Sequence, residues 1–163
     1  MEYGRRALSA RWPPWWRFTV PATSARRGEQ LCDDLADIAN QADCTGHYLV
    51  DGHLTRVDSV GTGAGARFRI KAPLNRFSWA DATFAEMQPP FRILERGRGG
   101  KYNRIRMIGT YTLSPAPGQS TKVEYTLETE PAHLSDRLME VLGGRSWNRR
   151  EAVKAMRRLR SSL

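Results

Sequence analysis

The sequence predicts an α+β domain in which a curved antiparallel β-sheet wraps around a long C-terminal α-helix. From residue 54 to residue 130 the hydrophobic period is two, in several segments separated by turn residues, which is typical of consecutive antiparallel strands. From residue 135 onward the period is helical. A sheet with one apolar face needs a cover, and this last helix carries an apolar stripe of matching length.

Length and composition indicate one globular domain. The chain has 163 residues, of which 40% are hydrophobic and 26% are charged. We expect residues 1–12 to form a flexible basic tail and residues 13–163 to form the single domain. No apolar run approaches the roughly 20 residues that span a bilayer. The basic N-terminus is not followed by the apolar region of a signal peptide, so a cytoplasmic location is expected.

The N-terminal part of the domain predicts one strand and one helix. Residues 15–20 are aromatic and β-branched, and Pro21 is expected to end this strand. Ser24 is a candidate N-cap. An apolar stripe then continues toward Asp43 at helical spacing and consists of Leu31, Leu35, Ile38 and Ala42.

A loop is expected through Gly52, followed by an antiparallel meander. Alternation is clearest at residues 66–71, where Phe68 and Ile70 share one face and basic residues share the other. Glycine- and proline-rich turns separate the strands. The predicted strands are residues 54–60 (weak), 66–71, 78–87, 91–96, 104–113 and 121–130.

The closing helix is expected to begin near Ser135. Its first turns carry Leu138, Met139 and Leu142, and its second half carries Trp147 and Met156. Gly143-Gly144 interrupts the pattern and predicts a kink. The two halves of the helix could move separately there, which makes this region a candidate entrance to the interior.

Three segments carry a resemblance to the START-like superfamily, also called SRPBCC, which includes polyketide cyclase/dehydrase-like and lipid-transport-like proteins. WRFTVPATSARRGEQLCDDLADI resembles its first strand, Pro-Ala turn and helix; FAEMQPPFRILERG resembles a strand–turn–strand unit; and GTYTLSPAPGQSTKVEYTLETEP resembles its last hairpin. The resemblance covers roughly residues 15–162. It implies the helix-grip fold, with a cavity between the concave sheet and the C-terminal helix, but no particular ligand. Where many members place a tryptophan after the first helix, this chain has Tyr48.

The candidate cavity residues are the inward members of the strands and of the closing helix. Apolar walls with a few polar groups are usual for a ligand site, but the same residues could instead fill a core. The predicted set is Phe68, Ile70, Phe84, Ile105, Met107, Tyr111, Val123, Tyr125 and Leu127 from strands, and Met139, Leu142, Trp147 and Met156 from the helix.

Glu86, Tyr111 and Tyr125 are the candidate catalytic residues. A buried tyrosine hydroxyl needs a partner, which is a ligand in a cavity or a backbone carbonyl in a core. Glu86 shares strand parity with Phe84. It either points into the cavity, where its pKa would be raised, or lies at the rim in solvent.

The predicted function is binding or transport of a hydrophobic small molecule such as a lipid, a polyketide or a quinone-like compound. A cyclase- or dehydratase-like enzyme is the alternative on the same fold. No GxSxG, HExxH or P-loop motif is present, and the turn at residues 61–65 lacks the GxGxxG spacing. Such cyclases orient a reactive chain without a fixed triad, so the absence of motifs leaves this alternative open.

The net charge of +9 raises a third alternative, a basic module that binds nucleic acid or an acidic partner. Basic residues cluster at positions 92–106 and along the last helix. Without a recognised motif, nucleic acid is not the expected partner. The alternatives are peripheral contact with an anionic membrane or an acidic protein, and a merely solvated surface. Cys44, His47 and His53 are too few for a convincing metal site, so neither metal nor cofactor is expected.

Overall fold

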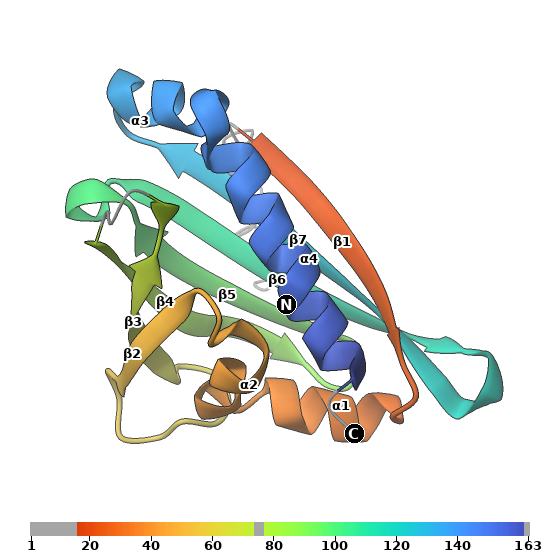
Figure 1. Ribbon diagram of the computed structural model, residues 1–163. Helices are drawn as coiled ribbons and strands as arrows, with labels where there is room; N and C mark the ends of the chain where they lie inside the picture. The colour runs from red at the N-terminus through yellow and green to blue at the C-terminus, as the bar shows by residue number, and fades with distance from the viewer. Residues whose placement is uncertain (1–15, 74–76, 162–163) are drawn as a thin grey trace, which may run out of the picture.

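The computed structural model describes residues 16–73 and 77–161. The predicted tail at residues 1–12 lies outside them. A seven-stranded antiparallel sheet, in the order β1-β7-β6-β5-β4-β3-β2, curves around the C-terminal helix (Figure 1). This is the helix-grip fold that the sequence predicts. The strands are β1 (Trp16–Ser24), β2 (Leu49–Leu54), β3 (Gly65–Lys71), β4 (Phe77–Gln88), β5 (Arg92–Gly99), β6 (Ile105–Ala116) and β7 (Ser120–Pro131).

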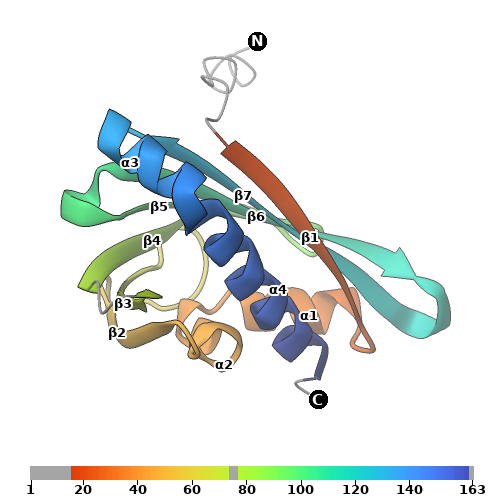
Figure 2. The same ribbon diagram turned by 45° about the horizontal axis from the view of Figure 1, so that its top comes forward.

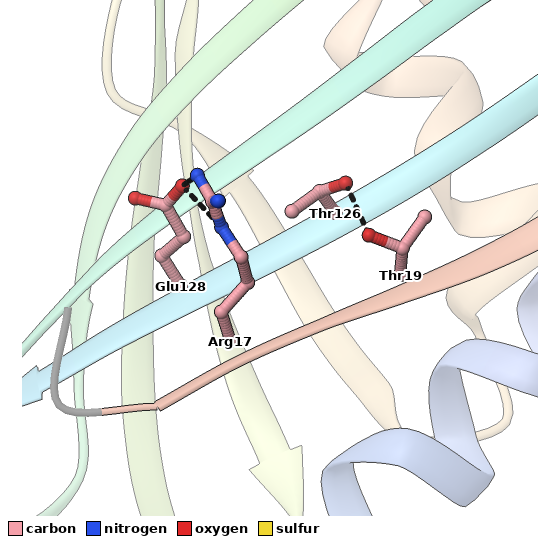
Figure 3. A network of polar contacts seen from close by, with 4 residues as sticks. All are labelled: Arg17, Thr19, Thr126 and Glu128. Atoms are coloured by element: carbon pink, nitrogen blue, oxygen red, sulfur yellow. Dashed lines mark hydrogen bonds and ion pairs between the residues drawn. The ribbon is translucent and has the colours of Figure 1, made fainter.

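Strand β1 runs past the point where the sequence predicts its end. Pro21 lies within it, opposite Glu124 of β7. Proline lacks an N–H donor, but β1 is an edge strand and pairs with a neighbour on one side only. A residue that faces the unpaired side needs no N–H for the sheet. On the outer face of this pair, Arg17 contacts Glu128 and Thr19 is hydrogen-bonded to Thr126 at 2.8 Å (Figure 3).

The first helical region is split rather than continuous. It contains α1 (Gly28–Leu35), a 3-10 turn (Ile38–Asn40) and α2 (Gln41–Thr45). The break follows from Asp37, whose carboxylate accepts a hydrogen bond from the backbone N–H of Ala39 and starts a new turn. Ser24 is not the N-cap; its hydroxyl accepts a bond from the N–H of Arg26 instead.

The first meander strand lies earlier than predicted. Residues 49–54 form β2, whereas residues 55–60 contribute only a bridge between Val60 and Asp37. The next strands match their predicted positions, but β5 and β6 are longer than the alternation indicates. Two 3-10 turns, Lys101–Asn103 and Pro117–Gln119, close the last two hairpins.

The C-terminal helix is interrupted where the sequence predicts. It consists of α3 (Leu134–Met139), a π-helical turn (Glu140–Gly144) and α4 (Arg145–Ser161). Gly143 has φ +151° inside this turn, a conformation that side chains rarely adopt. Helix α4 crosses the concave face of the sheet, and α1 and α2 lie near the C-terminal end of α4 (Figures 1 and 2).

Candidate functional site

The concave face of the sheet and helix α4 enclose a cavity of about 110 Å³, which we call the inner cavity. Its walls are mostly apolar and come from strands β2 to β7, from α2 and from α4. Of the predicted residues, Phe68, Ile70, Met107, Tyr111, Tyr125, Leu127, Trp147 and Met156 line it. A second hollow of about 260 Å³ lies beside it, between α1, α2 and α4. The two spaces share Gln41, Thr45, Tyr111, Ala155 and Met156.

The other predicted lining residues lie elsewhere. Phe84 and Val123 are fully buried in the core, and Ile105 is half-buried against Gly100. Met139 is 45% exposed and Leu142 is 71% exposed, because α3 and the π-helical turn extend beyond the sheet's concave face.

One carboxylate, that of Glu95, projects into the inner cavity. Gln41 Nε2 donates a hydrogen bond to Glu95 Oε2 at 3.0 Å, and the Tyr125 hydroxyl donates to Oε1 at 3.2 Å. The Tyr111 and Tyr125 rings lie side by side, with centroids 4.8 Å apart. The site is therefore an apolar cavity with a small polar cluster on one wall.

The environment of Glu95 raises the pKa of its carboxyl group. Desolvation by burial is the largest cause, and the hydrogen bonds from Gln41 and Tyr125 oppose it. Glu95 remains partly exposed because its side chain borders the inner cavity. Burial also raises the pKa values of Tyr48, Tyr111 and Tyr125, so all three hydroxyls stay protonated and can donate hydrogen bonds.

Glu95 owes its position to Gly109. The two residues face each other across β5 and β6. A Cβ atom at position 109 would overlap Glu95 Oε1 and Cγ, so glycine leaves room for the carboxylate where it lies. This explains the glycine that interrupts the apolar face of β6.

Glu86, the predicted inward carboxylate, lies on the opposite face. Phe84 pairs with Glu95, but Glu86 pairs with Leu94, so β4 has a bulge of one residue between them. The bulge reverses the side on which Glu86 projects. Its side chain is 33% exposed and lies 3.9 Å from Arg96. Glu86 is thus neither in the cavity nor at its rim, but on the outer face of the sheet.

Sequence reasoning missed two residues of the cluster, Gln41 and Glu95. It named Tyr48 only as the nearest aromatic residue after the first helix, and the structure places Tyr48 on the cavity wall. For Glu95 a signal was present, because it shares strand parity with Ile93, an apolar residue of the same short strand that is fully buried. Gln41 begins the short helix α2, and no sequence pattern marks it.

The cysteine and histidine residues do not converge. Cys32 and Cys44 are both free. His47 packs against Tyr48 and lies 3.1 Å from Glu151, whereas His53 packs against Trp79. Within residues 16–73 and 77–161 no group of three potential metal ligands occurs.

Three of the six basic residues at positions 92–106 face acidic partners. Arg96 lies near Glu86, Arg104 is bonded to Asp136 at 2.9 Å, and Arg106 lies 3.6 Å from Glu130. No helix of the described part of the chain is long and apolar enough to cross a membrane.

Comparison with solved structures shows the same fold at low sequence identity. The solution structure of KanY protein (ms6282) is similar with a TM-score of 0.70 and 14% identity, over 90% of this chain and 95% of that chain. TTHA0849 from Thermus thermophilus gives 0.67 and 11%, and major latex-like protein 151 from Panax ginseng gives 0.64 and 7%, each over 90% of this chain and 95% of the other. No protein-family profile and no curated protein matches the chain. These similarities establish the helix-grip architecture.

Proposed function

We propose that the protein binds a small hydrophobic molecule with a hydrogen-bonding group, in the inner cavity. The observation that carries this proposal is the Glu95 carboxylate, held by Gln41 and Tyr125 inside a mostly apolar cavity. A few convergent polar groups on apolar walls are what orients a ligand in most binding sites. The START-like relationship and a cytoplasmic location belong to the same proposal, and the two free cysteines suit a reducing compartment.

The size of the cavity limits the ligand. An engineered apolar cavity of roughly 150 Å³ accepts benzene, so about 110 Å³ suits one ring or one end of a longer lipid, polyketide or quinone-like molecule. The adjoining hollow provides a direction in which a longer ligand can extend.

A matched pair of ligands tests the proposal. Toluene and p-cresol differ only by a hydroxyl group, and p-cresol should bind about tenfold more tightly because it can donate a hydrogen bond to a carboxylate. Binding is followed by NMR from the backbone amides of Gly97 and Gly109, which line the cavity. Glu95→Gln should reduce this preference several-fold and leave toluene binding unchanged.

A cavity-filling variant locates the binding. Ala155→Leu narrows both hollows, whereas Ala132→Leu adds the same atoms at an exposed position and serves as the control. The proposal fails if neither ligand perturbs the glycine amides of the wild-type protein, or if both variants weaken binding equally.

The same cluster favours a second candidate function, acid–base catalysis of the cyclase or dehydratase type. A carboxyl group with a raised pKa, next to protonated tyrosines, is suited to removing a proton beside a ligand carbonyl. The tyrosines could stabilise the resulting enolate oxygen. Deuterium exchange at the α-carbon of phenylacetone, measured with wild type and Glu95→Gln, tests this function. Exchange no faster than in buffer would contradict it.

A further inference from the structure

An open groove of about 670 Å³ lies on the outer side of the inner cavity, between α4 and the segments that follow α2 and β3. We call it the outer groove. Its lining combines an aromatic pair with several basic side chains. The residues are His47, Tyr48, Lys71, Ala72, Pro73, Trp147, Glu151, Lys154, Arg157 and Arg158.

The charge of the outer groove is strongly positive. Its single carboxylate, Glu151, is largely buried and already has two neighbours, Lys154 Nζ at 2.8 Å and His47 Nε2 at 3.1 Å. Within residues 16–73 and 77–161, no carboxylate forms an ion pair with Lys71, Arg157 or Arg158. Three cations therefore face the groove without an acidic partner among the described residues.

The outer groove and the inner cavity meet at one pair of aromatic rings. Tyr48 and Trp147 line both spaces, and their rings are in edge-on contact with centroids 6.0 Å apart. A ligand that occupies both spaces would lie against these rings, with its apolar part in the cavity and its other end beside the cations.

We propose that the outer groove binds the anionic end of the ligand, a carboxylate or a phosphate monoester. The inference rests on the proposed function, which supplies the apolar part of the ligand in the inner cavity. Arginine suits both anions because its guanidinium group can donate two parallel hydrogen bonds. The ligand class is thus an anionic amphiphile, and the aromatic pair marks the boundary between its two parts.

Three probes with one apolar part test the inference by calorimetry: phenylbutanol, phenylbutanoate and phenylbutyl phosphate. The variant Arg157→Ser/Arg158→Ser removes two cations of the groove. Arg149→Ser/Arg150→Ser removes two exposed cations from the same helix outside the groove and is the matched control. The groove variant should bind both anionic probes about fivefold more weakly at low salt, the range expected when solvent-exposed ion pairs are lost.

Phenylbutanol should bind all three proteins equally. The inference is wrong if the groove variant binds the anionic probes as tightly as wild type, or if phenylbutanol is weakened by the same factor. If none of the probes binds wild type, the proposed function itself fails.

Discussion

At the scale of single residues, Glu95 combines two opposing effects. Burial disfavours its charged form, while hydrogen bonds from Gln41 and Tyr125 favour it. The net result is a raised pKa, so folding costs free energy whenever the carboxyl group is ionised. A residue that is unfavourable for stability at neutral pH, and yet held by two donors, is typical of a functional site.

Glu95→Gln should therefore stabilise the protein in a pH-dependent manner. The pKa of Glu95 is higher in the folded state than in the unfolded state, where it is near 4.5. The stabilising contribution of protonated Glu95 to the free energy of unfolding is therefore fully present below pH 4.5. It is lost as pH rises through the folded-state pKa. The free energy of unfolding of the variant minus that of wild type should thus be smallest at pH 4 and grow to a plateau. Urea unfolding across this range measures it, with Glu86→Gln as the control outside the cavity. A constant difference would contradict the raised pKa.

Gly109→Ala should disturb the cluster without touching a hydrogen-bonding group. The new methyl group would overlap Glu95 Oε1 and Cγ, so the carboxylate must move away from Tyr125. We expect a loss of about 1–3 kcal/mol, as for overpacked cores. Weaker p-cresol binding should accompany it. Thermal unfolding and the same NMR titration measure both effects. Unchanged binding would show that the position of Glu95 is not needed for the ligand.

The sequence pattern predicts the two cavity tyrosines correctly, but it indicates Glu86 instead of Glu95 as the cavity carboxylate. Tyr111 and Tyr125 lie opposite each other on β6 and β7, in strands whose alternation is regular. Glu86 lies just after a bulge, and one extra residue reverses which face a side chain occupies. Such a bulge depends on pairing with the neighbouring strand, so alternation within one strand does not reveal it.

At the scale of elements, local chemistry explains where the helices break. Asp37 caps a new turn inside an apolar stripe that is continuous in sequence. Gly143 adopts φ +151° and allows the π-helical turn between α3 and α4. Gly143-Gly144 makes the break between α3 and α4 visible in the sequence. Asp37 does not reveal the break after α1, because several other aspartates occur in the same helical region.

Gly143→Ala should weaken the C-terminal helix at this junction. Nothing lies within 4 Å of the position that a Cβ would occupy, so the cost comes from the backbone angle and not from a collision. We expect about 1–3 kcal/mol, the usual range for a strained residue. Ser146→Ala, an exposed residue just beyond the junction, is the control. Equal melting temperatures for the two variants would show that the π-helical turn can relax without cost.

At the scale of the whole molecule, the sequence predicts the fold well because the sheet has one dry face and one covering helix. The regular strands β3, β6 and β7 establish the meander, and the final stripe establishes α4. The size of the cavity could not be predicted in this way. Inward residues such as Phe84 and Val123 fill the core, whereas Met107 and Leu127 border the open space, and all four have the same sequence pattern.

The same view of the whole molecule shows where apolar surface remains exposed. Leu134, Leu138, Val141 and Leu142 of α3 and the π-helical turn are each more than half exposed. Beside them, exposed Tyr102 packs against Lys101 and Arg104, and Arg104 is bonded to Asp136 of α3. Apolar, aromatic and basic side chains thus meet at one end of the molecule, and the whole chain has a net charge of +9. Such a surface is suited to contact with an anionic bilayer.

The protein should therefore sediment with vesicles that contain phosphatidylserine and much less with neutral phosphatidylcholine vesicles. Leu138→Ser/Leu142→Ser should reduce this binding about tenfold, because each leucine loses part of the roughly 1.5–3 kcal/mol of its full burial. Val57→Ser, at a 98% exposed loop position, should have no effect. Binding that ignores lipid charge contradicts the prediction. The prediction is also contradicted if the wild-type protein is a dimer in analytical ultracentrifugation and the double variant is a monomer. A second copy of the chain, and not a bilayer, would then cover this surface.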